Sequence, residues 1–260
     1  MPELPEVERA RALIAARALH RTIAAVDDTD TYVCRPHPPG EIADALVGRE
    51  LVSADRRGKS MWCDTSGDGP ALGLHLGMAG RIVVDDDEAG DPNPDGGAPP
   101  HRWDRFTIRF ADGGRLILRD RRRLGRVRLE PAIERLGPDL AEVSRADFRA
   151  RVGRGRVAVK ARIMDQAVIA GVGNLLADEA LWRAGIDPRR PAGELAEAEL
   201  DRLRRALRAA NRSAIAKGGV HTGAMIPARH RDGVCPRCGT PMARGTIGGR
   251  TTYWCPAEQR

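Results

Sequence analysis

The sequence predicts an α+β protein with several domains: an all-β half led by one helix, then a helical half, then a small cysteine-bearing tail. Three observations support this prediction. Short apolar segments bounded by Gly or Asp fill the first half, a helical periodicity runs through the second, and three of the five cysteines crowd the C-terminus. A chain of 260 residues can bury more than one core. We therefore expect domains at 1–134, 135–219 and 220–260.

The chain opens with MPELPEVERAR, which predicts a helix from Pro5 to about Leu19. Proline suits the first turn of a helix, because its ring fixes φ and its missing N–H would have no partner there. This leaves Pro2 and Glu3 unexplained. If Met1 is removed, Pro2 carries a secondary amine that is partly unprotonated near neutral pH and can add to a carbonyl-like carbon. The neighbouring carboxylate of Glu3 could then move protons.

Four short apolar segments in the first half predict β-strands, because each is bounded by Gly or Asp; they cover residues 51–52, 60–63, 72–76 and 81–84. The polar run 85–100 lacks apolar periodicity and is rich in turn residues, so we expect a loop there. After it, apolar and polar residues alternate, an Ala-Asp-Gly-Gly turn follows, and the alternation resumes. This predicts a hairpin whose apolar face is formed by Phe106, Ile108, Phe110, Leu116 and Leu118.

The second half is helical in pattern from residue 147 to about 217. Its last helix has an apolar stripe at helical spacing and ends at a Gly-Gly pair. The stripe consists of Leu200, Leu203, Leu207, Ala210 and Ala214.

A second helix is predicted by AGVGNLLADEALWRAGIDP, residues 170–188. Gly171 and Gly173 allow a tight turn, and Asn174 is a suitable N-cap. Gly185 and then Pro188 end the helix. The stretch is either an ordinary helix-turn-helix corner or, with bare backbone amides at a helix start, a phosphate site.

The formal charge of +7 and a pI near 9.7 make an acidic polymer a plausible partner. Nothing resembles a signal peptide or a membrane span, so we expect a cytoplasmic protein. Only three of the 43 basic residues are lysines, so each lysine is a candidate for a role that needs an ammonium. Lys59 follows Arg56 and Arg57 on a predicted strand, where it either protects a sheet edge or contacts a phosphate.

The stretch RDRRRLGRVR places six arginines around Leu124 and Gly125. Such a run is usually solvated charge. An apolar residue among arginines also suits a wedge that enters a base stack from the minor groove. Met78, in HLGMAG, is by default a core methionine.

The tail reads CPRCGTPMARGTIGGRTTYWCPAEQR. Cys235 and Cys238 have C-x2-C spacing, Cys255 follows on a second knuckle, and Glu258 occupies the place of a fourth cysteine. The pattern favours a structural zinc site. The alternative is a hairpin that packs through Tyr253 and Trp254 without metal.

Together these motifs resemble the formamidopyrimidine-DNA glycosylase and endonuclease VIII family. The resemblance runs nearly end to end, and it rests on PELPEVE, RRGK, HLGMAG, DRRRLG, MDQAVIAGVGNLLADEALWRAGI and the terminal cysteine hairpin. It implies an N-terminal β-sandwich catalytic domain with a leading helix, a helix-two-turn-helix DNA-binding domain and a C-terminal zinc-finger-like β-hairpin. The implied function is a base-excision-repair glycosylase and AP lyase. Such an enzyme acts, as a monomer, on double-stranded DNA with damaged bases or abasic sites.

The resemblance also implies catalytic roles. Pro2 would attack C1′ of the damaged nucleotide, expel the base and hold the sugar as an iminium, after which β/δ-elimination cuts the strand. Glu3 would handle protons at the sugar, and Glu6 would orient the lesion. Lys59 would grip the phosphate of the extruded nucleotide.

Further residues are implied to bind DNA or metal. Asn174 and Arg250 would share the phosphate contact, and three residues would fill the gap left by the extruded base, since chemistry on such a base needs fillers. These are Met78, Arg122 and Leu124. Zinc would bind Cys235, Cys238, Cys255 and Glu258. Lys160, before MDQ, falls where the family often keeps a lysine and receives no role.

Three features depart from the family pattern. Leu124 stands where an aromatic residue is usual, with Arg121 where proline is common; Glu258 replaces a cysteine; and residues 220–234 are shorter than the segment that caps an oxidised purine in some members. Oxidised purine, ring-opened purine and oxidised pyrimidine all stay open as lesions. The rival class is a non-catalytic damaged-DNA-binding protein on the same scaffold, which would not need Pro2 and Glu3.

Overall fold

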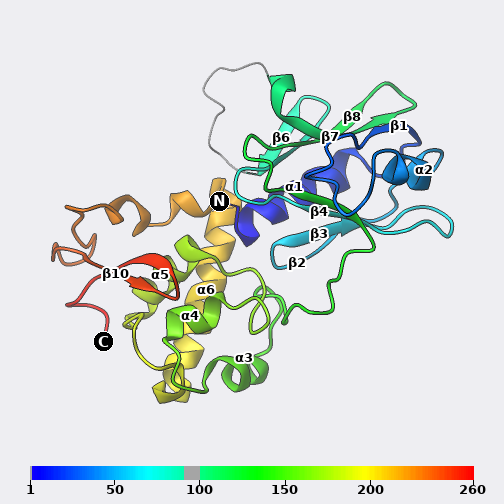
Figure 1. Ribbon diagram of the computed structural model, residues 1–260. Helices are drawn as coiled ribbons and strands as arrows, with labels where there is room; N and C mark the ends of the chain where they lie inside the picture. The colour runs from blue at the N-terminus through cyan, green and yellow to red at the C-terminus, as the bar shows by residue number, and fades with distance from the viewer. Residues whose placement is uncertain (1, 91–99) are drawn as a thin grey trace. The chain divides into compact units, whose positions relative to one another are not determined.

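The computed structural model describes residues 2–90 and 100–260, which form two compact units (Figure 1). Unit 1 contains Pro2 and Glu6–Ile133, and unit 2 contains Glu3–Pro5 and Glu134–Arg260. The boundary near residue 133 lies beside the one expected at 134, whereas the segments 135–219 and 220–260 fall into a single unit. Within the described ranges, no helix has the combination of length and apolarity needed to span a bilayer.

Unit 1 is built on two antiparallel sheets (Figure 1). The five-stranded sheet has the order β1 (Ile23–Asp27), β7 (Asp104–Phe110), β8 (Arg115–Arg119), β5 (Arg81–Val84), β6 (Asp87–Gly90). The four-stranded sheet has the order β2 (Asp55–Arg57), β3 (Ser60–Cys63), β4 (Leu72–His75), β9 (Arg126–Leu129). The unit's helices are α1 (Leu4–Arg17, whose first residues belong to unit 2), α2 (Glu41–Leu46) and the 3-10 turn η1 (Pro100–Trp103).

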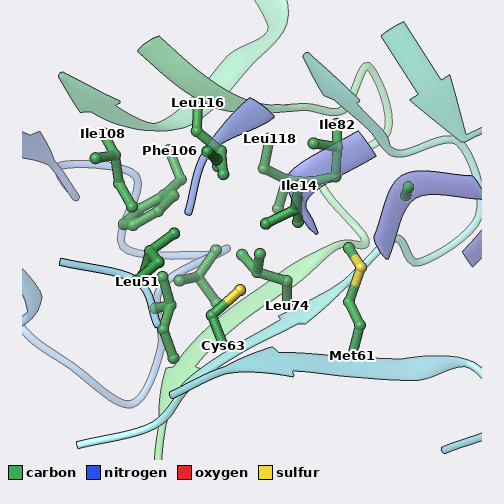
Figure 2. Packing of buried hydrophobic residues seen from close by; sticks show 14 of the residues in the cluster. Ile14, Leu51, Met61, Cys63, Leu74, Ile82, Phe106, Ile108, Leu116 and Leu118 are labelled. Atoms are coloured by element: carbon green, nitrogen blue, oxygen red, sulfur yellow. The ribbon is translucent and has the colours of Figure 1, made fainter. Parts of the chain in front are cut away.

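The core of unit 1 lies between these sheets (Figure 2). Alternate residues of a strand point to the same face, so each sheet presents one apolar face to the other. Side chains from β5, β7 and β8 meet side chains from β3 and β4, and Ile14 of α1 joins them. The predicted β-sandwich with a leading helix is confirmed, and so is the hairpin, whose five apolar residues are all buried.

The strand predictions were correct for β3, β4 and β5 and wrong at residues 51–52, 87–90 and 59. Residues 87–90 were expected in a loop, but they form β6, because backbone pairing with β5 requires no apolar periodicity. The remainder of that run, 91–99, lies outside the described residues. Residues 51–52 form only an isolated bridge, from Leu51 to Thr65.

Strand β1 and helix α2 were not predicted. The start of α2 is held by a carboxylate from a distant residue: Asp28 accepts N–H groups of Gly40, Ile42 and Ala43 at 2.8, 3.0 and 3.2 Å. A cap supplied from twelve or more residues away leaves no local sequence signal.

Unit 2 contains four α-helices and a β-hairpin (Figure 1). The helices are α3 (Arg145–Val152), α4 (Val159–Met164), α5 (Asn174–Ala184) and α6 (Glu197–Lys217), and the strands are β10 (Ala243–Ile247) and β11 (Arg250–Trp254). Three 3-10 turns complete it: η2 (Ala192–Glu194), η3 (Val220–Thr222) and η4 (Ile226–Ala228). The predicted stripe of α6 is buried, and Gly218 ends that helix in the left-handed conformation with φ 102°.

Candidate active site

Glu3 is buried, and its carboxylate forms the cap of α5. Oε1 accepts the N–H of Leu175 at 2.8 Å, and Oε2 accepts the N–H of Leu176 at 3.0 Å. The helix dipole and these two donors stabilise a negative charge at this place. The prediction that Asn174 is the N-cap was therefore wrong: Gly173 holds the cap position, Asn174 is the first helical residue, and the capping carboxylate comes from the N-terminal segment.

The two glycines of the GVGN motif make room for that segment. A Cβ on Gly173 would lie 2.2 Å from Cδ of Glu3, and a Cβ on Gly171 would lie 2.4 Å from Cδ1 of Leu4. Real Cβ atoms do not approach other atoms so closely, so a side chain at either position would displace Glu3 or Leu4, and Gly171 also takes φ 111°, which favours glycine. Two of the backbone amides that were expected to bind a phosphate, those of Leu175 and Leu176, are thus occupied by Glu3.

Gln166, which our sequence analysis did not single out, organises the turn before α5. Its Nε2 donates to the carbonyls of Met164 (2.8 Å) and Val172 (2.9 Å), and its Oε1 accepts the N–H of Gly171 at 3.0 Å. The MDQ triplet in the sequence was the available signal. Gln166 therefore sets the path of the backbone on which Glu3 and Leu4 pack.

The side chain of Asn174 is held by a buried lysine. Lys160 Nζ donates to Asn174 Oδ1 at 2.7 Å, and Asn174 Nδ2 donates to the carbonyl of Thr251 at 3.1 Å. Burial lowers the pKa of the Lys160 ammonium, and the nearby Asp178 carboxylate opposes that shift. Arg250 is exposed at the start of β11, after the Gly-Gly turn of the hairpin.

In unit 1, the predicted site residues Pro2 and Glu6 are buried. Lys59 lies in the two-residue turn between β2 and β3, not on a strand as predicted, because Arg57 pairs with Ser60 and the chain must reverse at 58–59. Gly58 takes φ 61° in this turn, as such a tight hairpin requires. Desolvation lowers the pKa of nearby His75, and the charges of Lys59 and Arg126 lower it further.

The loop after β8 carries the predicted wedge, and buried Asp120 shapes it. The Asp120 carboxylate accepts N–H groups of Arg122, Leu124 and Gly125 at 2.9, 2.7 and 2.6 Å. Arg122 is exposed and Leu124 is half-buried. Met78, expected by default in the core, is 37% exposed. Gly77 packs on the backbone of Leu124, where a Cβ would lie 2.3 Å from its carbonyl carbon.

The strand register gathers these loops at one end of the four-stranded sheet. The start of β3, the end of β4 and the start of β9 are level with one another, as the pairs Met61–Leu74 and His75–Arg126 show. Lys59 precedes β3, Met78 follows β4, and Leu124 precedes β9. Unit 1 therefore brings together the predicted phosphate-binding lysine and the predicted wedge.

Three cysteines in unit 2 form a cluster, in which the Sγ atoms of Cys235, Cys238 and Cys255 lie within 4.8 Å of one another. Thiolates bound to one zinc at about 2.3 Å lie about 3.8 Å apart, so the cluster fits such an ion. Burial raises the pKa of Cys235, but N–H donors from the Trp182 indole and the backbone lower it more, to about 7. Burial and the contacts with the other two thiols raise the pKa of Cys255 to about 11, so Cys235 is the thiol that ionises more readily.

Glu258 is not part of this cluster. It is exposed, and its carboxylate lies 4.0 Å from Arg237 Nη1. The tail is held by other contacts: Gln259 Oε1 accepts the N–H of Cys255 at 2.8 Å, and Gln259 Nε2 donates to the carbonyl of Ile186 at 2.9 Å.

Comparison with protein families gives two matches. Residues 1–127 match the formamidopyrimidine-DNA glycosylase N-terminal domain, and residues 136–224 match the formamidopyrimidine-DNA glycosylase H2TH domain. Curated relatives named formamidopyrimidine-DNA glycosylase align over the whole chain. The protein from Alkalilimnicola ehrlichii is 36% identical, with all of both chains covered, and that from Nocardioides sp. is 35% identical, with 94% of its length covered.

Solved structures with the same fold include complexes of Lactococcus lactis Fpg. One contains the wild-type protein with DNA bearing an oxidised pyrimidine (TM-score 0.83, 27% identity), and another contains abasic-site DNA (TM-score 0.83, 26% identity). The first alignment covers all of both chains and the second 99% of each.

Proposed function

The chain belongs to the formamidopyrimidine-DNA glycosylase family and is a base-excision DNA glycosylase, and on this premise we propose that Pro2 is its nucleophile after removal of Met1. The free amine of Pro2 forms a bond to C1′ of the damaged nucleotide while the bond from C1′ to the base breaks, and the base leaves with a proton. The C1′–O4′ bond then breaks, the Pro2 nitrogen loses its proton to form an iminium with C1′, and O4′ takes up a proton. Loss of a C2′ proton then breaks the bond from C3′ to its phosphate, and a second elimination releases the 5′ phosphate.

The observation that supports this most is the position of Glu3. A buried carboxylate directly follows the nucleophile in the chain and is fixed by two backbone donors of α5. A fixed carboxylate is suited to shuttling a proton at the sugar ring. A non-catalytic DNA-binding protein would keep the basic surface without needing this pair, and family membership also favours the enzyme.

We assign the DNA contacts as follows. Lys59, Asn174 and Arg250 hold the phosphate of the extruded nucleotide, and Glu6 orients the lesion. Met78, Arg122 and Leu124 fill the gap in the duplex, with Arg122 facing the orphan base. Support comes from the exposure of Met78 and Arg122 and from the arrangement of their loops at one end of the sheet.

The substrate we propose is duplex DNA with an oxidised base or an abasic site, bound by a monomer acting on chromosomal DNA in the cytoplasm. The solved L. lactis relatives are complexes with such DNA, including Fapy-dG, an oxidised pyrimidine and an abasic site. Duplex oligonucleotides with one lesion each, assayed for base release and strand cleavage, would test the proposal and rank the lesions. Failure to release any oxidised base would contradict it.

DNA affinity is expected to depend steeply on salt. If roughly six phosphates are neutralised, the affinity should fall by about 10³ between 50 and 200 mM salt, because each contact releases condensed counterions. Lys59→Ala should reduce the slope of log affinity against log salt by about one. Fluorescence titrations at four salt concentrations would measure both slopes.

Arg109→Ala is the matched control for Lys59→Ala, since it removes one exposed positive charge from β7. Its slope should equal that of the parent protein. A flat salt dependence in the parent, or equal slopes for Lys59→Ala and the parent, would contradict the assigned phosphate contacts.

We propose that Cys235, Cys238 and Cys255 hold one structural zinc ion, and that Glu258 becomes the fourth ligand when its exposed carboxylate turns from Arg237 toward the cluster. Elemental analysis should then find one zinc per chain, bound more weakly than in a four-cysteine site because the fourth donor is an oxygen. Zinc, when bound, would order the hairpin that presents Arg250. A chelator should therefore impair DNA cleavage without altering the Pro2 amine.

Two variants separate the parts of this proposal. Glu258→Gln should lower zinc occupancy if the carboxylate is a ligand, and Glu258→Cys should raise it. Cys34→Ala, which changes a buried cysteine outside the cluster, is the control and should leave occupancy unchanged. Zinc far below one per chain in the parent and in Glu258→Cys would show that packing alone holds the hairpin.

A further inference from the structure

Lys160 is completely buried, and no role assigned so far uses it. Its Nζ lies 2.7 Å from Asp178 Oδ1, 2.7 Å from Asn174 Oδ1 and 2.6 Å from Thr252 Oγ1. An ammonium has three N–H donors and no acceptor. Two of them are donated to Asn174 and Thr252, and the contact with Asp178 is an ion pair whose geometry is not that of a hydrogen bond. Because its side chain is completely buried, Lys160 does not contact DNA itself.

The contact with Lys160 fixes the orientation of the Asn174 amide. Because the ammonium can only donate, it holds Oδ1 toward itself and turns the NH₂ group away. That group donates to the carbonyl of Thr251 at 3.1 Å and keeps a second N–H. A phosphate oxygen can only accept, so it needs this orientation of the amide. The flipped amide would place two donors against the ammonium.

The same lysine ties Asn174 to the hairpin strand that carries Arg250. Thr252 Oγ1 accepts from Lys160 and donates to the carbonyl of Arg250 at 3.0 Å. The paired carboxylate extends the network, because Asp178 Oδ2 also accepts from Arg229 Nε at 2.9 Å and from the N–H of Tyr253 at 3.3 Å. One buried ion pair thus joins α4, α5 and β11.

We propose that Lys160 is a positioning residue for DNA binding: it acts through Asn174, whose amide it orients toward the phosphate, and it secures the strand that bears Arg250. This inference rests on the proposed function, in which Asn174 and Arg250 contact the phosphate. Asp178 contributes by keeping the buried ammonium charged and in place.

The test is a double-mutant cycle on affinity for a duplex with a stable abasic-site analogue. Lys160→Met and Asn174→Ala should each weaken binding by about tenfold, the size expected for a charge-assisted hydrogen bond. The double variant should bind at most about threefold more weakly than Asn174→Ala alone. The reason is that the two substitutions remove the same contact, the one between Lys160 and Asn174. When Lys160→Met is combined with Lys59→Ala, the fold-decrease in DNA affinity should equal the product of the two single fold-decreases.

Two controls separate positioning from folding. Lys160→Met leaves the buried Asp178 carboxylate without its ammonium and should lower the melting temperature. Lys160→Met/Asp178→Leu removes the pair and should restore part of the loss, because Arg229 and the N–H of Tyr253 still lose their acceptor. We expect the DNA affinity of Lys160→Met/Asp178→Leu to remain about tenfold below that of the unchanged protein. Lys217→Met removes an exposed lysine from the same unit and should bind as the parent does.

The outcomes are distinguishable. If Asn174→Ala binds as the parent does, the phosphate contact of the proposed function fails, and the role of Lys160 fails with it. If Asn174→Ala weakens binding, and the double variant shows the product of the two single fold-decreases in affinity, only the role of Lys160 is overturned. Recovery of affinity together with melting temperature in Lys160→Met/Asp178→Leu would also overturn it.

Discussion

Borohydride reduction in the presence of DNA with an abasic site is expected to leave a covalent protein–DNA adduct on residue 2. The physical reason is that the amine of Pro2 and the aldehyde of the open sugar form an iminium, which hydride converts to a stable amine. Peptide mapping of the adduct should show a chain without Met1. While Met1 remains attached, the Pro2 nitrogen belongs to an amide and cannot act as a nucleophile.

Two variants make this expectation specific. Pro2→Leu removes the secondary amine and should reduce base excision by at least about 10⁴-fold, as loss of the nucleophile does in other enzymes. Lys59→Ala removes the other amine assigned to the site and should still form the adduct, with weaker DNA binding. An adduct on Lys59, or the absence of any adduct with the parent protein, would refute the mechanism.

The sequence was sufficient for the elements whose apolar pattern is local. The stripe of α6 and the hairpin of β7 and β8 each repeat with the period of their secondary structure, and both were predicted correctly. Strand β6 and helix α2 depend on partners far along the chain, namely strand β5 and the carboxylate of Asp28. No local periodicity marks such partners.

The candidate site shows the same division. Pro2 and Glu3 were recognised as unusual because helix capping at Pro5 did not explain them. The actual contact of Glu3, a cap on α5, joins residues 172 positions apart and could not be read from either segment alone. For the same reason Asn174 was wrongly assigned as the cap, since Asn is a good N-cap by local preference. The roles of Gln166 and Asp120, both bonded to backbone groups of their own loops, were also missed.

Glu3→Gln is expected to retain binding to DNA with a damaged base and to lose base excision by about 10²–10⁴-fold, the usual contribution of a positioned proton-transfer group. The amide can replace one of the two contacts at α5, because its oxygen accepts the N–H of Leu175 or Leu176. Its NH₂ group would then face the other N–H. The variant should therefore also lose about 1 kcal/mol of stability, as other helices do without their cap. Gel shift would measure binding, and denaturing gels would measure excision.

The structural and chemical roles of Glu3 can be separated with a second helix cap in unit 2. Ser144 Oγ accepts the N–H of Asp147 at 3.0 Å at the start of α3, so Ser144→Ala removes a cap without touching the proposed chemistry. It should lower stability by about 1 kcal/mol and leave excision unchanged. If Glu3→Gln were to lose no more excision than Ser144→Ala at matched stability, the carboxylate would be a structural cap only. A loss of excision that persists when the reaction is run well below the melting temperature of both variants would place the proton transfer on Glu3, because capping alone predicts recovery there.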